Sequence, residues 1–528
     1  MFIMTYNPFG YEGIVIRVEA DIRRGIPGID ISGLAAGAVR EARERVRAAF
    51  RNSGFKFPND RILINLAPAG VRKDGAALDL AIALAVMAAA GAIPPGDDTM
   101  VLGELELSGR VRPVYGTLAA AAAGREAGIR HFIVPSVNAS EAAILDGCDV
   151  AGVDSLEDAV NVLRCLREHG RLPETARARG TKGGAAHAPE AQAVFAVKGQ
   201  KRYKRALEIA AAGGHNLLVF GPPGSGKTML ARCMPLIMPP LTQEEAITVT
   251  RLHSLAGLSV DGLIMKPPFR SPHHSASAEG ILGGGRAVRP GEISLAHFGV
   301  LFLDEAPEFK VNVLQSLREP LEDRRITISR AESSVRLPAN FQLVMAANPC
   351  PCGRLGVKSG EHRDSEDRYG VKAGTETGCY CSGDDIMRYW RRFGGALLDR
   401  IELRVPVNTP SVSDLSGGAE DTAEAAAARV GRAAAIQAVR FAGTGFRRNA
   451  GLDAGAIDRY CALGGKALNA FTGAVEKLGI SGRAYHGILR VARTVADLEG
   501  ADSIGAEHIM EAVMHRRHGD DPYDVFSV

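Results

Sequence analysis

One short stretch constrains the fold of this chain more than any other, the sequence NLLVFGPPGSGKTML at residues 216–230. An apolar run that suits a buried strand leads into a glycine-rich turn and then a helix-forming run, which predicts an α/β core. Glycines let backbone N–H groups point into a concave nest for phosphate, and the next helix N-terminus adds a favourable dipole. The expected phosphate-binding loop consists of Gly221, Pro222, Pro223, Gly224, Ser225, Gly226, Lys227 and Thr228.

Two residues of this loop have specific chemical roles. A lysine at the position of Lys227 adds positive charge at the β- and γ-phosphates of a nucleotide. The hydroxyl of a threonine at the position of Thr228 can ligate Mg²⁺. We therefore expect ATP and Mg²⁺ as cofactors.

Two further apolar runs end in polar residues. The run GVLFLDEAPEF at 299–309 brings Asp304 and Glu305 to the end of a strand, and FQLVMAAN at 341–348 ends in Asn348. Ligands bind at the carboxyl ends of strands in α/β sheets. We expect Asp304 to hold Mg²⁺, Glu305 to polarise the attacking water, and Asn348 to position that water near the γ-phosphate.

Two arginines complete the expected hydrolytic site. Arg400 lies in ALLDRIEL at 396–403, and Arg483 lies in SGRAYHGIL at 481–489. A γ-phosphate needs its charge neutralised, and an arginine from a neighbouring subunit often does this.

Four cysteines follow Asn348 in a C-x-C…C-x-C pattern. Cys350 and Cys352 are separated from Cys379 and Cys381 by 26 residues that are polar and rich in glycine. Four thiolates suit a tetrahedral Zn²⁺ site, which would give this segment a fold that burial cannot. Four reduced thiols without metal, or a disulfide, are the alternatives.

The chain divides into regions of different composition. Residues 1–168 mix strand and helix signals, 169–192 read as a linker, 193–410 as the nucleotide-binding core with an insertion at 349–385, and 411–528 as a helical domain. The longest apolar run, Leu80–Pro94, is too short for a membrane span and predicts a buried helix. The sequence shows no signal peptide and only eight cysteines, so we expect a cytoplasmic protein.

Positive charge is concentrated between residues 40 and 73. This segment contains nine basic residues and three acidic ones. This pattern is typical of a solvated helix face, and a surface that binds a polyanion is the alternative.

The motifs 216–230, 299–309, 341–348, 396–403 and RAYHGILRVARTVADL at 483–498 together resemble the magnesium-chelatase-like AAA+ proteins of the ComM/YifB family. The resemblance implies an ATP-hydrolysing homo-hexamer in which Arg400 is the trans-acting finger and Arg483 the second sensor on a C-terminal helical lid. It also implies a DNA helicase for branch migration during natural transformation. Such a protein integrates incoming single strands by homologous recombination. The expected partners are single-stranded, double-stranded and branched DNA, with recombination proteins and without a membrane.

The N-terminal region resembles the Lon-protease fold, an α+β domain. In the proteolytic form, a KDG segment leads to a nucleophilic serine that a later lysine activates. Here RKDGAALDLA at 72–81 places Ala77 at the serine position, and Leu118 stands at the lysine position. Neither residue can perform that chemistry, so we expect a non-proteolytic domain whose Arg72 and Lys73 contact the DNA backbone.

Two segments of the core are candidates for further DNA contact. FRSPHHSASAEGILGGG at 269–285 suits a flexible loop in a ring channel, where His273, His274 and Ser275 would touch DNA. DRRITISRAESSVRLP at 323–338 predicts a hairpin that presents Arg325 and Arg330. A pair of surface histidines and a plain surface hairpin are the respective alternatives.

Two other functions are consistent with such a core. One is a chelatase-type motor that drives metal insertion through a partner protein, and the other is the unfoldase part of a protease. The missing serine and lysine argue against an autonomous protease, and the N-terminal extension argues against a minimal chelatase motor.

Overall fold

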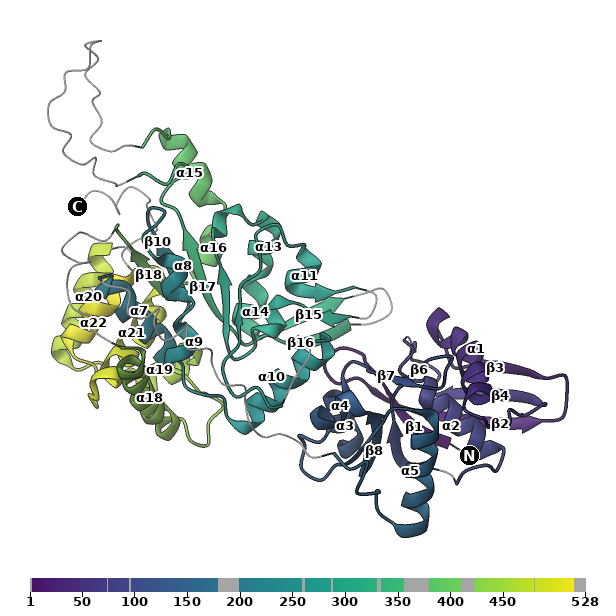
Figure 1. The fold of residues 1–528 in the computed structure, drawn as a ribbon. Coiled ribbons are helices and arrows are strands. Elements are labelled where there is room, and N and C mark those ends of the chain that lie inside the picture. Colours follow the sequence, from purple (N-terminus) through teal and green to yellow (C-terminus); the bar gives the residue numbers. More distant parts are fainter. Residues whose placement is uncertain are drawn as a thin grey trace.

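In a computed structural model, the chain is organised around two large sheets and a C-terminal set of helices (Figure 1). The described residues are 2–73, 75–94, 96–178, 199–258, 262–285, 288–329, 334–355, 379–409, 422–478 and 480–516. We call residues 2–178 the N-terminal unit, 199–409 the central unit and 422–516 the C-terminal helices. Within these ranges no helix is both long and apolar enough to cross a membrane.

The N-terminal unit is a seven-stranded mixed sheet with the strand order β3-β4-β2-β1-β5-β8-β9. Its strands are β1 (Phe2–Asn7), β2 (Ile14–Arg23), β3 (Gly28–Ser32), β4 (Arg61–Ala67), β5 (Gly96–Val101), β8 (His131–Pro135) and β9 (Asp149–Val153), with a short hairpin of β6 (Glu104–Leu105) and β7 (Val111–Arg112). Its helices are α1 (Gly37–Asn52), α2 (Asp79–Ala89), α3 (Thr117–Glu126), α4 (Ser136–Ala142) and α5 (Leu156–His169). Every residue of α2 from Asp79 to Ala88 is buried, which confirms the expected buried helix.

The first residues of the expected linker lie against the N-terminal unit. The helix α5 continues to His169. The amide of Gly152 donates to the carbonyl of Ala176 at 2.9 Å, and the amide of Ala178 donates to Val150 at 2.9 Å. Residues 176–178 therefore run beside the edge strand β9, and residues 179–192 of the expected linker lie outside the described residues.

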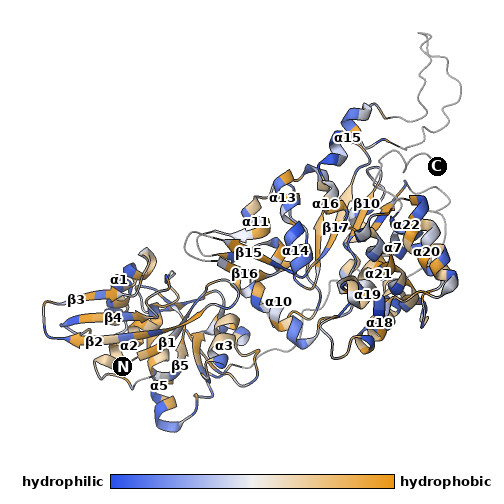
Figure 2. Cartoon of the chain, turned by 180° about the vertical axis from the view of Figure 1, so that it is seen from behind, coloured by the Kyte–Doolittle hydropathy of each residue, from blue (hydrophilic) through white to orange (hydrophobic). Residues whose placement is uncertain are grey.

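The central unit is a five-stranded, wholly parallel sheet with the order β11-β14-β17-β10-β18. Its strands are β10 (Leu217–Phe220), β11 (Phe269–Arg270), β14 (Val300–Leu303), β17 (Gln342–Ala347) and β18 (Leu403–Pro406). The sheet strands β10 and β17 are hydrophobic, whereas the outer helices α14 and α15 carry many hydrophilic residues (Figure 2). Every side chain of β10, β14 and β17 is buried, as a parallel sheet covered on both faces requires. The predicted α/β core is confirmed.

The rest of the central unit consists of helices and short strands. The helices are α7 (Lys201–Gly213), α8 (Lys227–Ala231), α9 (Met234–Ile237), α10 (Gln243–Leu255), α11 (Ala278–Leu282), α12 (Glu292–Leu295), α13 (Val311–Ser316), α14 (Arg318–Asp323), α15 (Gly383–Arg391) and α16 (Gly395–Leu398), with a 3-10 turn at Ala306–Glu308. The short strands β12 (Gly283–Gly284) and β13 (Arg289–Pro290) pair with each other.

The C-terminal helices share one hydrophobic core with the central sheet. They are α18 (Ala423–Arg440), α19 (Ala454–Tyr460), α20 (Gly465–Leu478), α21 (Gly482–Glu499) and α22 (Ala506–Arg516), with a 3-10 turn at Asn449–Gly451. Val430 of α18 and Val491 of α21 belong to the same buried cluster as Leu217 and Val219 of β10. The amphipathic run expected at 483–498 is the long helix α21.

The expected hairpin at 323–338 is present as β15 (Arg325–Ser329) and β16 (Ser334–Pro338), which pair antiparallel. Val335 and Leu337 are buried and form a small cluster with Phe9 and Tyr11 of the N-terminal unit. Arg325 is exposed, and Arg330 lies outside the described residues. One face of the hairpin therefore packs against the N-terminal unit.

Helix α10 makes the main apolar contact between the N-terminal and central units. Its residues Ala246 and Val249 lie in one buried cluster with Leu118 of α3. The guanidinium of Arg251 donates to the carbonyl of Glu12 at 3.0 Å and lies 4.3 Å from the centre of the Tyr11 ring. The contact is thus apolar in its centre and polar at one side.

Two histidines are buried within the central unit in their neutral form. The His215 ring lies 2.8 Å from the Thr494 hydroxyl, and His297 Nδ1 accepts from the Asn340 amide at 2.9 Å. Burial lowers the pKa of both rings to about 3, with the charge of Arg490 adding to the shift at His215.

These histidines should make folding sensitive to acid. As pH falls below about 6.5, the unfolded chain gains protons that the folded chain cannot accept, so stability is lost from there down toward the folded pKa. We expect each histidine to cost about 2 kcal/mol of unfolding free energy between pH 6.5 and pH 5. Urea unfolding of wild type and of His215→Gln/His297→Gln would measure this. The variant should lose most of the dependence, and the exposed His169→Gln control should keep it.

Candidate nucleotide-binding site

The predicted phosphate-binding loop follows β10 and leads into α8, as the sequence indicated. Gly224 and Gly226 have φ of +75° and +84°, which side chains other than glycine adopt at a cost. A Cβ built on either would meet nothing within 4 Å, so this side of the loop is open to a ligand. At Gly221 a Cβ would lie 2.0 Å from the Val407 carbonyl. Glycine is required there because Val407, which directly follows β18, passes close behind the loop.

The ammonium of Lys227 lies inside the curve of this loop. It donates to the carbonyls of Gly221 and Pro222 at 2.7 and 2.9 Å and to the Asn348 side chain at 3.3 Å. Burial lowers the pKa of Lys227 to about 8, although the carboxylates of Asp304 and Glu305 oppose this shift. A bound phosphate would favour the charged ammonium.

Asp304 and Glu305 stand at the carboxyl end of β14. The Thr228 hydroxyl donates to Asp304 Oδ2 at 2.8 Å, so the two expected Mg²⁺ ligands are in contact. A hydroxyl beside a carboxylate is an oxygen donor set that Mg²⁺ accepts. Glu305 has a φ of +48°, and its side chain is 55% exposed, so its carboxylate is accessible to water.

Asn348 follows β17, which lies between β14 and β10 in the sheet. Because these strands are parallel, their carboxyl ends meet at one edge. The contact of Asn348 with Lys227 places its amide beside the phosphate loop. The structure thus brings together Lys227, Thr228, Asp304 and Asn348, which are far apart in the sequence.

The histidines expected to contact DNA lie at this same edge. The strand β11 pairs parallel with β14, so the residues after it emerge beside Asp304 and Glu305. His274 Nδ1 is 3.9 Å from Glu305 Oε2, and the His273 ring lies tilted against the His274 ring with centroids 4.1 Å apart. The His273 ring also contacts the Ser275 hydroxyl at 2.7 Å. The sequence did not indicate that His274 lies beside Glu305. Contact of these residues with DNA stays a prediction.

Two residues that sequence reasoning missed support the loop from behind. Gln200 donates to the carbonyls of Ser225 and Asn408 at 3.1 and 2.6 Å. The Tyr203 hydroxyl donates to the carbonyl of Lys227 at 3.0 Å. No local pattern marks either residue, because their partners lie more than 20 residues away.

Arg400 and Arg483 meet at a different place. Both guanidiniums pair with Glu322 at the end of α14, Arg400 at 2.6 Å. Hydrogen bonding from Arg400 holds the pKa of Glu322 below its ordinary value. Both arginines line a cavity of about 600 Å³ between the central unit and the C-terminal helices. Within the part of the chain that the structure describes, neither guanidinium forms a hydrogen bond or ion pair with the phosphate loop of its own chain.

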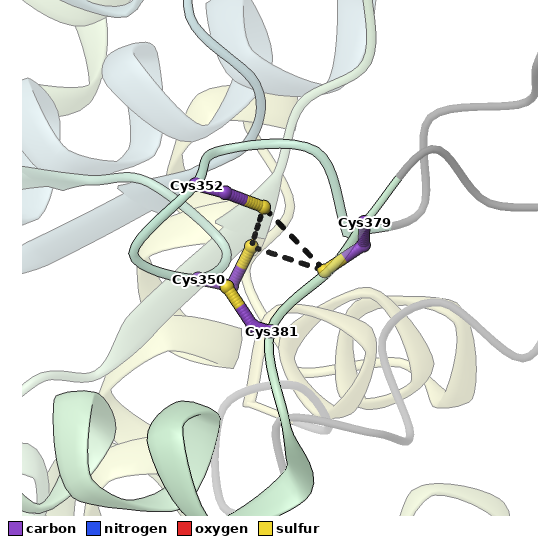
Figure 3. Close-up of side chains that lie close together, drawn as sticks. All are labelled: Cys350, Cys352, Cys379 and Cys381. Atoms are coloured by element: carbon purple, nitrogen blue, oxygen red, sulfur yellow. Dashed lines mark hydrogen bonds between the residues drawn. The ribbon is translucent and has the colours of Figure 1, made fainter.

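The four cysteines converge, as Figure 3 shows. The Sγ atom of Cys350 lies 3.3 Å from Cys352 and 3.6 Å from Cys379, and all four sulfurs are within 4.8 Å of one another. Tetrahedral Zn²⁺ with Zn–S bonds of about 2.3 Å requires sulfurs about 3.8 Å apart. These distances exceed a disulfide bond, and all four residues are free thiols. The donor set therefore fits zinc.

Of the two basic residues expected to bind DNA in the N-terminal unit, only one is accessible. Arg72 is exposed. Lys73 is fully buried, and its ammonium donates to the carbonyls of Gly33, at 2.9 Å, and Pro68. This burial contradicts the expectation that Lys73 contacts DNA. Its charge is satisfied by the backbone of its own domain.

The positions of the missing protease dyad lie in an apolar environment. Ala77 packs against the same buried cluster that contains Leu118. The two positions are thus close to a shared core, where neither side chain offers a nucleophile or a base.

Comparison with known families matches most of the chain. Residues 18–138 match the model of subunit ChlI of Mg-chelatase, 194–415 that of magnesium chelatase, subunit ChlI, and 420–516 that of its C-terminal part. An uncharacterized protein YifB of Escherichia coli is 38% identical over 518 residues, covering 97% of this chain and 96% of that protein. Competence protein ComM of Haemophilus influenzae is 38% identical over 512 residues, covering 96% and 95%. Lon protease 2 of Thermus thermophilus is 28% identical over 191 residues, 24% of its length.

The contact between Thr228 and Asp304 leads us to predict how ATP binding depends on Mg²⁺. We expect Asp304→Asn to raise the Mg²⁺ concentration needed for half-maximal ATP binding about tenfold or more, because the amide carries no charge for the cation. Fluorescent-nucleotide titration at a series of Mg²⁺ concentrations would measure it. Binding in EDTA should be unchanged, since the loop amides and Lys227 remain. The exposed Asp323→Asn is the control, and an unaltered Mg²⁺ requirement in Asp304→Asn would exclude this role.

Proposed function

This chain belongs to the magnesium chelatase ChlI-related AAA+ family that includes YifB and ComM, and we propose that it is an ATP-driven ring motor that moves branched DNA. The family supports ATP hydrolysis. The proposal extends this to a homo-hexameric DNA translocase that promotes branch migration during recombination of incoming single strands.

The observation that carries the proposal is the convergence of the hydrolytic residues at one edge of the central sheet. Lys227 and the loop amides would bind the β- and γ-phosphates. Glu305 would orient a water and accept its proton, and Asn348 would hold that water near the γ-phosphate. Thr228 and Asp304 would hold Mg²⁺, which would neutralise charge on the phosphates.

The placement of Arg400 and Arg483 supports a ring. Arg400 precedes β18, which runs parallel to β10, so it lies at the opposite edge of the sheet from the loop that follows β10. Arg483 shares Glu322 with it. In a ring, this surface of one subunit would face the nucleotide of its neighbour, where Arg400 would act as the trans finger and Arg483 as the lid sensor.

A stripe of arginines on α1 supports the choice of DNA as the partner. Arg40, Arg43, Arg47 and Arg51 are exposed at three- and four-residue spacing, which places them on one side of the helix. Arg72 adds a further exposed charge. The name of the ComM relative, a competence protein, fits a DNA substrate.

A metal-insertion motor acting on a protein partner is the second candidate, favoured by the matched chelatase models.

The four cysteines complete the proposal as a structural Zn²⁺ site. Cys350, Cys352, Cys379 and Cys381 would each supply one thiolate.

The catalytic carboxylate can be tested by strand displacement. We expect Glu305→Gln to bind ATP and assemble normally but to lose at least about 100-fold in ATP hydrolysis and in unwinding of forked and four-way junction DNA, because the amide cannot accept the proton of the attacking water. Glu308→Gln, an exposed acid three residues later, should retain both activities. Unwinding by Glu305→Gln at the wild-type rate would show that another residue is the base. Hydrolysis that DNA does not stimulate, with no unwinding, would favour the metal-insertion motor.

The proposed DNA surface can be tested by charge reversal. We expect Arg43→Glu/Arg47→Glu to weaken binding to DNA of every sequence and to reduce the slope of log K against log salt concentration by about two, one for each lost phosphate contact. Fluorescence anisotropy at several salt concentrations would measure both. The control is Lys466→Glu/Lys477→Glu, an equal reversal of exposed residues on α20. If the two pairs have the same effect, α1 is only a solvated helix face.

A further inference from the structure

We infer that the four-cysteine cluster forms part of the wall of the nucleotide site and that its metal positions the phosphate loop and Asn348 through Trp390 and Gly353. The inference rests on the ATP and zinc sites proposed above. It assigns to the metal a role in ATP turnover, in addition to joining two segments of chain. Trp390 and Gly353 would be positioning residues, since they act through the loop and not on ATP.

The first connection is along the backbone. Only Pro349 separates Asn348, whose amide contacts Lys227, from Cys350, which is fully buried in the core beneath the sheet edge. A metal bound to Cys350 would therefore fix the chain two residues from Asn348. The position of the Asn348 side chain would then depend on the metal.

The second connection runs through α15, which begins directly after Cys381. The Ser382 side chain caps this helix and forms a capping box with Asp385, so the helix start is well defined. Trp390 on α15 donates from Nε1 to the Pro349 carbonyl at 3.0 Å. The helix that follows one cysteine pair thus holds the segment that precedes the other.

Trp390 also reaches the strand that carries the phosphate loop. Its ring packs edge-to-face on Phe220, with centroids 5.3 Å apart, and only 5% of its surface is exposed. Phe220 is the last residue of β10 and directly precedes Gly221. An indole fixed between Pro349 and Phe220 links the cysteine cluster to the start of the loop.

The third connection is direct. Gly353, one residue after Cys352, has a φ of +76°, and a Cβ built on it would lie 2.9 Å from Pro223 Cδ of the phosphate loop. The turn that carries the first cysteine pair is therefore in van der Waals contact with the loop. Movement of this turn on loss of the metal would be transmitted to Pro223.

Trp390 is the only tryptophan of the chain, so its emission reports on this wall alone. We expect the purified protein to contain one zinc per chain. Releasing it with a thiol-reactive mercurial, or preventing its binding with Cys379→Ser/Cys381→Ser, should shift the Trp390 emission. It should also lower kcat/KM for ATP about 10- to 100-fold, measured without DNA. Adding back a thiol and Zn²⁺ should restore emission and activity after mercurial release. Cys148→Ser/Cys165→Ser, which removes two thiols of the N-terminal unit, is the control and should change neither.

Two milder variants test the contacts while leaving the cysteines intact. Gly353→Ala should retain zinc but raise KM for ATP about tenfold, because its methyl group would displace Pro223. Gly443→Ala is matched to it, since Gly443 has a φ of +73° but a Cβ there would meet nothing within 4 Å. This control should lose similar stability and keep its KM. Trp390→Phe, which removes the hydrogen bond to Pro349, should retain zinc and lower kcat/KM severalfold.

The possible results distinguish a failure of this inference from a failure of the proposed zinc site or of the proposed DNA activity. A wild-type protein without zinc would overturn the metal site and the inference with it. Stoichiometric zinc whose release leaves kcat, KM and Trp390 emission unchanged would overturn the inference alone. Equal KM values for Gly353→Ala and Gly443→Ala would do the same. None of these assays contains DNA, so a failure of the proposed DNA activity would not produce any of these results.

Discussion

The parallel pairing of β14, β17 and β10 is the constraint on which the rest of the central unit depends. Parallel strands end at the same edge, so this pairing alone brings together Asp304, Asn348 and the phosphate loop from three distant parts of the chain. The strands are buried on both faces and read as continuous apolar runs, so the polar residues of this site lie at the strand ends. The helices on either face secure the pairing, and the active-site geometry follows from it.

The same sheet separates the two groups of residues that the proposed ATP hydrolysis requires. The loop and carboxylates lie at one edge, and Arg400 with Arg483 and Glu322 lies toward the other. A single chain can therefore bind the nucleotide with one edge while offering arginines with the other. This polarity suits a closed ring in which every interface is the same, since each subunit presents both halves once.

The sequence predicted the parts of the fold that depend on local pattern. The phosphate loop, the strands ending in Asp304 and Asn348, the buried helix α2 and the hairpin β15–β16 all have short motifs or clear periodicity. It could not predict contacts between distant segments, because the packing of those segments decides which of several similar residues makes each contact. Counting charges did not distinguish Lys73, whose ammonium is buried on backbone carbonyls, from the exposed Arg72. For the same reason nothing local placed His274 beside Glu305 or Trp390 on Phe220.

The contact of α10 with α3 determines where this chain can be divided. The segment 179–198 separates the two units in sequence, but Ala246, Val249 and Leu255 of α10 are buried against residues of the N-terminal unit. A truncated chain that starts after this segment would expose that apolar face to water and would be prone to self-association. The unit of independent folding is thus larger than the nucleotide-binding region. Substitutions on α10 and α3 are also constrained jointly, because both helices contribute side chains to the same core.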